Sequence, residues 1–283
     1  MNQQEVVNVS GLPREWITLT REAGIAAQLI CTGLTALRKA NFSQPELYNH
    51  AFFGLSIGLE RLAKLVILID DKISPPFQYP TNTEFKHKYG HDLQKLFGEV
   101  EARRVKYQSE LKWSLPDRDL ALTALAVLSD FAKSTRYYNL DVLTGAPNID
   151  SKRDPVEAWY TTVATEVLKR KYSGRQKLKD AAEAEFLEKL IEGKAHVLFT
   201  AEDGTHIGSI HDSAIRAKQA KIIQRESTVI SACLARHMSE VLFVLHYQQS
   251  TSNSSIPPLH EFFSIFFNDE RDFRAWKMFS IAR

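Results

Sequence analysis

The sequence has few cysteines, no long apolar run and no export signal. Its two cysteines, Cys31 and Cys233, stand in apolar helical patterns, where a thiol usually packs as a small core residue. This usage excludes a disulfide framework and favours a reducing compartment. The opening MNQQEVVNVS lacks the charged and apolar regions of a signal peptide, and no run of about 18 uninterrupted apolar residues occurs. We therefore expect a cytoplasmic protein with no membrane contact.

The sequence also lacks a strong charge excess and the common motifs of nucleotide enzymes. It has 36 basic and 34 acidic residues, whereas a general polyanion binder normally shows a larger imbalance. Any nucleic-acid contact must therefore come from a local patch. No G-x-S-x-G nucleophile motif and no glycine-rich phosphate loop is present, which argues against serine hydrolases, P-loop enzymes and Rossmann enzymes. We expect no cofactor.

What the sequence does contain is helical periodicity. With 283 residues and 44% hydrophobic composition, the chain can bury a large core without metals or disulfides. The strongest pattern runs over 46–71, where apolar residues recur at alternating steps of three and four, and Ser43 with Glu46 predicts a capping box at its start. Three prolines predict a loop over 73–83. Further helices are predicted over 13–40, 91–107, 117–141, 154–174 and 176–192.

The remainder contains one non-helical element. The segments 196–200 and 205–209 flank Asp203-Gly204, which suits the left-handed turn of a β-hairpin. A long helix over about 212–247, a polar linker over 248–258 and an aromatic tail helix follow. We predict an all-α protein, with a helical bundle in residues 1–147 and a C-terminal helical region in residues 148–283 that carries a small hairpin.

The stretch KYGHDLQKLF, residues 88–97, places a histidine and an acid directly ahead of an apolar helical repeat. In one interpretation Asp92 caps the following helix, because a carboxylate is favoured at a helix N-terminus. In the other, His91 faces a polar cluster in STRYYNLD near the end of the fourth predicted helix. That cluster contains Arg136, Asn139 and Asp141. The alternative for this cluster is an ion pair of Arg136 with Asp141 or Asp130.

The segment AFFGLSIGLERLAKLVILIDD, the proline-containing loop, KYGHDLQKLF and the fourth predicted helix together resemble the HEPN superfamily of small α-helical bundles. The resemblance covers about residues 14–145. It implies a homodimeric protein of bacterial abortive-infection or toxin–antitoxin systems, in several cases a metal-independent ribonuclease. The family's nuclease signature is an arginine followed after four to six residues by a histidine. Here Arg136 is followed by Asn139 and Asp141, so the histidine is missing.

Cleavage of RNA without metal needs one group that removes the 2′-hydroxyl proton and another that protonates the leaving oxygen. We consider a composite site in which His91 supplies one of these groups and Arg136 stabilises phosphate charge. Asp141 would act as the base. Glu60 would orient the imidazole of His91, or it forms an ordinary intrahelical ion pair with Lys64.

A local basic patch occurs in KRKYSGRQKLK, residues 169–179, which has six basic residues and no acid. These charges fit an RNA backbone, or they complement the dipole at a helix C-terminus. Asp203, His206, His211 and Asp212 surround the hairpin, but turn formation and helix capping explain them and we expect no metal site. The candidate nucleic-acid-binding residues are Lys169, Arg170, Lys171, Arg175, Lys177 and Lys179.

These patterns lead to two expectations of different classes. The first is a bacterial defence or stress protein that binds RNA or a nucleotide and acts as an endoribonuclease with a degenerate motif. The second is a non-catalytic interaction module, such as a sensor or antitoxin-like partner of a defence-system protein. Metal-independent cleavage of RNA separates the two.

Overall fold

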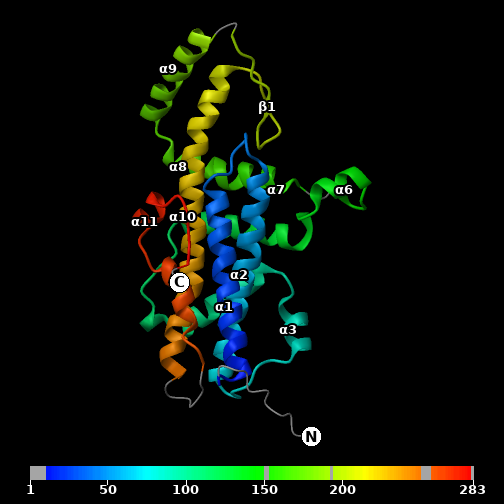
Figure 1. Ribbon diagram of the computed structural model, residues 1–283, viewed down its shortest axis with the longest axis vertical. Helices are drawn as coiled ribbons and strands as arrows, with labels where there is room; N and C mark the ends of the chain where they lie inside the picture. The colour runs from blue at the N-terminus through cyan, green and yellow to red at the C-terminus, as the bar shows by residue number, and fades with distance from the viewer. Residues whose placement is uncertain (1–10, 150–152, 192–193, 250–255, 282–283) are drawn as a thin grey trace.

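The computed structural model describes residues 11–149, 153–191, 194–249 and 256–281. Three long helices run side by side through the molecule: α1 (Arg14–Leu37), α2 (Glu46–Ile73) and α10 (Ile210–Gln248) (Figure 1). The protein is all-α with one small hairpin and one long helix, as the periodicity predicts. The other α-helices are α3 (Asn82–Tyr89), α4 (Leu93–Lys106), α5 (Arg118–Asp130), α6 (Tyr138–Thr144), α7 (Pro155–Trp159), α8 (Thr165–Lys171), α9 (Gly174–Ile191) and α11 (Glu270–Ala275).

The remaining elements are short. Strands β1 (Phe199–Thr200) and β2 (His206–Ile207) pair antiparallel around the predicted Asp203-Gly204 turn, where Gly204 has φ +77°. Two π-helical turns occur: η2 (Phe131–Thr135) follows α5, and η4 (Tyr160–Ala164) joins α7 to α8. Two further segments, η1 (Gln108–Glu110) and η6 (Leu259–Phe266), are 3₁₀-helical.

Helices α1 and α2 pack with their backbones unusually close together. A Cβ atom added at Gly54 would lie 2.6 Å from the carbonyl oxygen of Leu29, and one at Gly33 would lie 2.7 Å from the amide nitrogen of Leu55. Only glycine fits at such contacts. This contact places α2 at the centre of the molecule, where its other faces meet α4, α5 and α10.

A single large apolar cluster joins both halves of the chain. Its fully buried members include Phe52 of α2, Trp159 of α7, Leu234 of α10 and Phe263 of η6. Side chains from either side of the predicted boundary at residue 147 therefore pack into the same core. Cys31 and Cys233 are buried and free within it, as their patterns predict.

One helix of the described residues, α10, is long and apolar enough to cross a membrane by length and composition. However, 94% of its apolar stretch is buried inside the protein, which is the environment of a core helix.

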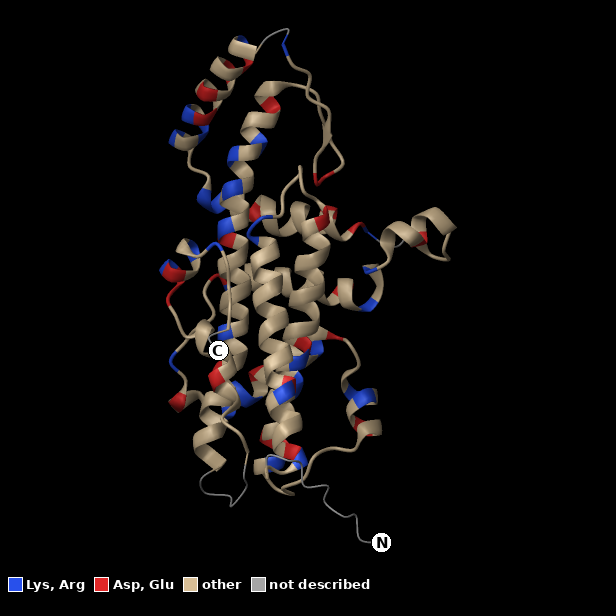
Figure 2. Cartoon of the chain, viewed as in Figure 1, with Lys and Arg blue, Asp and Glu red and all other residues tan. Residues whose placement is uncertain are grey.

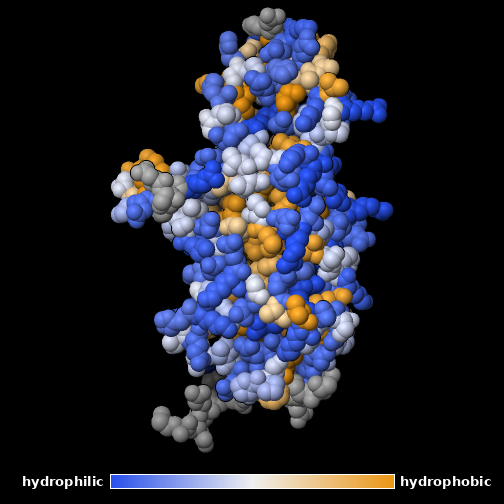
Figure 3. Space-filling view, turned by 180° about the vertical axis from the view of Figure 1, so that it is seen from behind, coloured by the Kyte–Doolittle hydropathy of each residue, from blue (hydrophilic) through white to orange (hydrophobic). Residues whose placement is uncertain are grey.

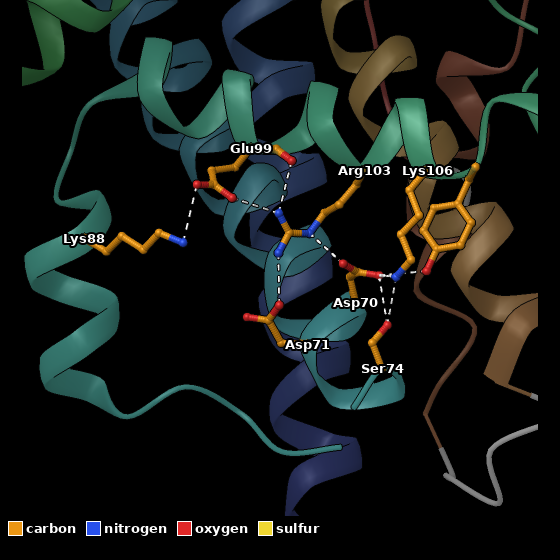
Figure 4. A network of polar contacts seen from close by, with 8 residues as sticks. Asp70, Asp71, Ser74, Lys88, Glu99, Arg103 and Lys106 are labelled. Carbon is orange, nitrogen blue, oxygen red and sulfur yellow. Dashed lines mark hydrogen bonds and ion pairs between the residues drawn. The ribbon is translucent and has the colours of Figure 1, made fainter. Parts of the chain in front are cut away.

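An ionic network fastens the C-terminal end of α2 to α4 (Figure 4). The guanidinium of Arg103 lies 3.0 Å from the carboxylate of Asp70 and 2.9 Å from that of Asp71, and the Lys106 ammonium lies 2.8 Å from Asp70. Burial raises the pKa of the Asp70 carboxyl, but hydrogen bonds from Lys106 and Tyr107 outweigh this effect and the pKa lies below its usual range. The network holds the C-terminal half of α4 against the C-terminal end of α2.

The prediction of one continuous helix over 117–141 is wrong. The α-helix ends at Asp130, a π-helical turn follows, and the chain breaks at Arg136 and Tyr137 before α6, which projects from the body (Figure 1). Phe131 explains the π turn, because its ring packs 5.6 Å from Phe52 and 5.2 Å from Phe53. The wider turn keeps Phe131 in the core while the following residues leave it.

The capping box predicted at Ser43 is also wrong. Asn41 accepts hydrogen bonds from both the backbone N–H and the hydroxyl of Ser43, at 2.8 and 2.6 Å, so Ser43 is committed to a local turn. Pro45 occupies the N-cap position of α2 without a side-chain cap. The aromatic tail helix is likewise replaced by η6 and the short α11, although Phe263 and Phe273 are buried as core residues.

Candidate functional site

One face of α2 carries most of the polar candidates. Asn49, Phe53, Glu60 and Lys64 follow one another at steps of four, seven and four, which places them on the same side of the helix. Two residues singled out from the sequence contact this face: His91 contacts Glu60, and Arg136 contacts Phe53.

The imidazole of His91 is held by the carboxylate of Glu60. Nδ1 of His91 lies 3.1 Å from both carboxylate oxygens, and Lys64 donates to Oε1 at 2.7 Å. The Glu60 side chain is only 11% exposed, whereas that of His91 is 68% exposed. Glu60 therefore makes both contacts considered for it, the ion pair with Lys64 and the contact with His91. With Nδ1–H donating to Glu60, the Nε2 lone pair of His91 is left available to act as a base.

The turn that presents His91 depends on its neighbours. Gly90 has φ +50°, which lets the chain reverse between α3 and α4. Asp92 caps α4 as predicted, accepting from the amides of Gln94 and Lys95 at 3.1 and 3.2 Å. It also accepts from the Lys133 ammonium at 3.3 Å. Successive residues therefore contact different elements: His91 lies against α2, and Asp92 lies against the π turn after α5.

Arg136 has no carboxylate partner among the described residues. Asp130 pairs instead with Lys133 at 3.8 Å, and Arg136 donates to the carbonyl oxygen of Ala132 at 2.9 Å. Its guanidinium carbon lies 5.7 Å from the centroid of the Phe53 ring. The expected ion pairs of Arg136 with Asp130 and Asp141 are therefore not formed, and the cation remains available to an external anion.

Arg136 and Asn139 line a cavity of about 210 Å³ between α2, the helix break and the start of α7. Asp154 also lines this cavity, and it caps α7 by accepting from the amides of Val156 and Glu157. A second cavity of about 480 Å³ adjoins the first, and Asn49 and Asn139 line both. The remaining lining residues of the first cavity are Phe53, Thr135, Tyr137, Tyr138, Leu140, Pro155 and Val156.

The structure separates the members of the composite site. His91 and Asp141 do not line the cavity of Arg136. The contacts of His91 and Arg136 on α2, at Glu60 and Phe53, are seven residues apart, which is two helical turns or about 10 Å along the axis. The two side chains thus occupy neighbouring positions on one face and not one cavity.

The basic run at residues 169–179 is less free than its sequence indicates. Arg170 lies 2.7 Å from Glu166 and 3.3 Å from Asp117, and Lys179 lies 3.8 Å from Glu183. Carboxylates outside the run thus neutralise part of it. Lys169 also pairs with Glu166, Lys177 lies over the ring of Tyr172, and Lys171 and Arg175 are exposed.

The residues around the hairpin serve local structure. Asp203 accepts from the backbone and hydroxyl of Thr205 at 3.2 and 2.7 Å and pairs with Arg216 at 2.8 Å. Asp212 lies in the first turn of α10, where its amide donates to the cap residue Ser209. Within the described ranges, no three His, Cys, Asp or Glu side chains are grouped so as to hold a metal ion.

Sequence analysis missed Asn49, Phe53 and Tyr137 as members of the site. The spacing of Asn49 and Phe53 relative to Glu60 shows that the three share a face of α2, and this signal was available in the sequence. The sequence gives no such signal for the contact of Arg136 with this face, because that contact depends on the helix break before α6.

Comparison of the chain with family models, with curated proteins and with solved structures finds no match.

Proposed function

We propose that the chain is a HEPN-like, cytoplasmic protein of bacterial defence or stress responses that binds RNA or a nucleotide at the Arg136 cavity. The observation that carries the proposal is that Arg136, half-buried against Phe53, has no acidic partner in the described parts of the chain. A guanidinium in this state binds a phosphate with charge-assisted hydrogen bonds.

The surroundings of Arg136 suit the other parts of a nucleotide. The amides of Asn49 and Asn139 offer donors and acceptors to a base or ribose, and Tyr137, which is 60% exposed, offers a ring for stacking. An RNA strand that follows the polar face of α2 from Phe53 to Glu60 would pass His91. Cleavage needs two proton-transfer groups, and His91 supplies one of them.

Binding is tested by fluorescence anisotropy with labelled single-stranded RNA in EDTA. Arg136→Ala should weaken binding at least tenfold, since a charge-assisted bidentate contact contributes about 1.5–3 kcal/mol. Lys133→Ala is the matched control: this cation lies three residues away but already pairs with Asp92 and Asp130, so its loss should change affinity little. Equal effects of the two variants would contradict the proposed site.

Cleavage is tested with total RNA and tRNA in EDTA. If the protein is a ribonuclease, both His91→Ala and Arg136→Ala should abolish cutting while both variants keep the helical content of the wild type. Cutting that survives in His91→Ala would remove His91 from the mechanism.

A second candidate function, a protein-interaction module, is favoured by α6. This helix projects from the body, and Leu140, Val142 and Leu143 are 59%, 48% and 81% exposed on it (Figure 3). A wild type that neither binds nor cuts RNA would favour this role, and Leu140→Asp with Leu143→Asp would then identify α6 as the contact surface.

A further inference from the structure

A small cavity lies where four helices meet beside the start of the basic run at residues 169–179. Its volume is about 150 Å³, and its lining comes from the start of α5, the C-terminal end of α8, α10 and α11. We call it the α8 cavity. Figure 2 shows lysine and arginine gathered around the C-terminal end of α8 and the neighbouring part of α10. The α8 cavity shares no residue with the Arg136 cavity.

Part of the lining is apolar and buried. Leu120, Val167, Val229 and Ile230 line the α8 cavity, and all four side chains are buried. An apolar cavity of about this volume holds a molecule the size of benzene. The α8 cavity is therefore too small for a nucleotide, and it fits the hydrocarbon body of a small molecule.

The charged part of the lining includes two cations with unused donors. The ammonium of Lys171, the last residue of α8, makes no ion pair or hydrogen bond with any residue that the structure describes. Arg274 of α11 contacts Glu226 through Nε at 3.1 Å, and its terminal nitrogens contact no described carboxylate. Arg170 also lines the cavity, but two acids already share its charge. Lys171 and Arg274 can therefore donate to a ligand.

The acids of the lining, in contrast, already have cationic partners. Glu226, which is only 4% exposed, accepts from Arg225 and Arg274 at 2.8 and 3.1 Å. Glu270 accepts from Arg236 at 2.9 Å, and the third acid pairs with an arginine of α8. Because Arg225 and Arg236 add positive charge from outside the lining, cations exceed acids around the α8 cavity.

A neighbouring arginine shows the effect of this excess. Nη2 of Arg38 donates to the backbone carbonyl oxygen of Arg274, and its buried Nη1 has no hydrogen-bond partner among the described residues. Burial and the charge of Arg225 lower the pKa of the Arg38 guanidinium, and the opposing effect of Glu226 is smaller. The cations around Glu226 therefore repel one another, and a bound anion would reduce this repulsion.

We propose that the α8 cavity binds a short aliphatic carboxylate, whose charged end meets Lys171 and Arg274 while its hydrocarbon body contacts the apolar lining. Such a ligand uses both parts of the lining, whereas inorganic phosphate would use only the charged part. An amino acid would gain little from its ammonium group, because the acids of the lining are already paired. The site is separate from the proposed RNA site and does not depend on it.

A series of small ligands tests the chemistry by NMR titration of the full chain. 3-Methylbutanoate should bind with a dissociation constant of about 1 mM or below, as expected for a ligand of this size. 3-Methylbutanamide has the same body without the charge, and should bind at least about tenfold more weakly. Inorganic phosphate and leucine should also bind more weakly. No binding of 3-methylbutanoate, or equal binding of the amide, phosphate or leucine, overturns the proposal.

Substitution of one lysine tests the location. Lys171→Ala should weaken binding of 3-methylbutanoate about tenfold, because a charge-assisted hydrogen bond is lost, and Lys171→Arg should retain most of the affinity. Lys221→Ala is the matched control. Lys221 of α10 is likewise exposed and without an ion pair to any described residue, but it does not line the α8 cavity. Equal losses of affinity in Lys171→Ala and Lys221→Ala would place the ligand elsewhere and overturn the proposal.

Discussion

The two halves of α10 have the same secondary structure and different surroundings. Between Glu226 and Leu245 nearly every residue is buried, because α1, α2, α4, α5 and η6 surround that half. Between Ile210 and Arg225 only Ala220 and Ile223 are buried, because α9 is the main element packed against that half. The helix is continuous, so the difference arises from packing. The core half holds the fold together, and the outer half lies largely at the surface.

Ionisable groups follow the same division. In the core half, Arg104 lies 3.0 Å from Glu240, and both side chains are at least nine-tenths buried. On α9, which packs against the outer half, Lys189 and Glu185 pair at 2.7 Å with both side chains more than 60% exposed. A buried pair leaves an uncompensated charge when one partner is removed, whereas an exposed pair is readily replaced by water.

The largest expected effect on stability is that of truncating a core leucine, compared with an exposed leucine near the outer half. Leu59→Ala removes a fully buried side chain of α2 and should lower the free energy of unfolding by about 3–5 kcal/mol. Leu198→Ala truncates a side chain that is 79% exposed beside the hairpin, and should change it by less than about 0.5 kcal/mol. Urea unfolding measures both. Similar losses of unfolding free energy in the two variants would mean that the region around the hairpin is as tightly packed as the core.

Glycine replacement sharpens the comparison at the helix contact. Gly54→Ala should cost about 1–3 kcal/mol, because the new Cβ would meet the backbone of α1 at 2.6 Å. Gly98→Ala is the matched control within α4, where a Cβ meets nothing within 4 Å. That variant should gain up to about 1 kcal/mol from helix propensity. Thermal unfolding that shifts both variants downward would contradict the close approach of α1 and α2.

The smallest effect concerns pH and a pair that links α4 to the core half of α10. Burial raises the pKa of Glu101, but hydrogen bonds from His237 and Arg118 outweigh burial and hold the pKa at about 2 instead of 4.5. Between these pH values the unfolded chain binds more protons than the folded chain. The contribution of Glu101 to stability is therefore complete above about pH 5 and is lost as the pH falls towards 2.

Glu101→Gln should therefore reduce the acid-induced loss of stability by about 1–2 kcal/mol, after allowance for the partial exposure of this carboxylate. Chemical unfolding at a series of pH values from 6 to 2.5 measures the slope. An unchanged slope in the variant would show that Glu101 does not contribute to acid sensitivity.

Much of the fold was predictable because it depends on neighbours in the sequence. The long helices, the caps at Asp92 and Asp154 and the hairpin turn at Gly204 each follow from contacts within a few residues. The helix break at Arg136 was not predictable in this way, because the π turn before it depends on the packing of Phe131 against α2. The short helix α3, begun by a capping box at Thr81 and Glu84, was not recognised behind the prolines.

The candidate site likewise contains one contact that the sequence indicated and one that depends on the helix break. Glu60 and His91 were considered together from their positions, and the structure brings them to 3.1 Å. Arg136 was expected beside His91, but the break turns its guanidinium onto Phe53, two helical turns away.

The sequence alone indicates the positions of the long helices, because hydrogen bonds within a helix and caps at its ends act over three or four residues. Packing sets the break after α5 and the short elements of the tail. Only the tertiary structure decided which faces are covered. The large apolar residues of α9 have the spacing of a core-facing helix, yet they lie outside because Asp180 and Ala184 occupy the contact with α10. Burial depends on how distant segments share the limited interior, and no local pattern fixes that outcome.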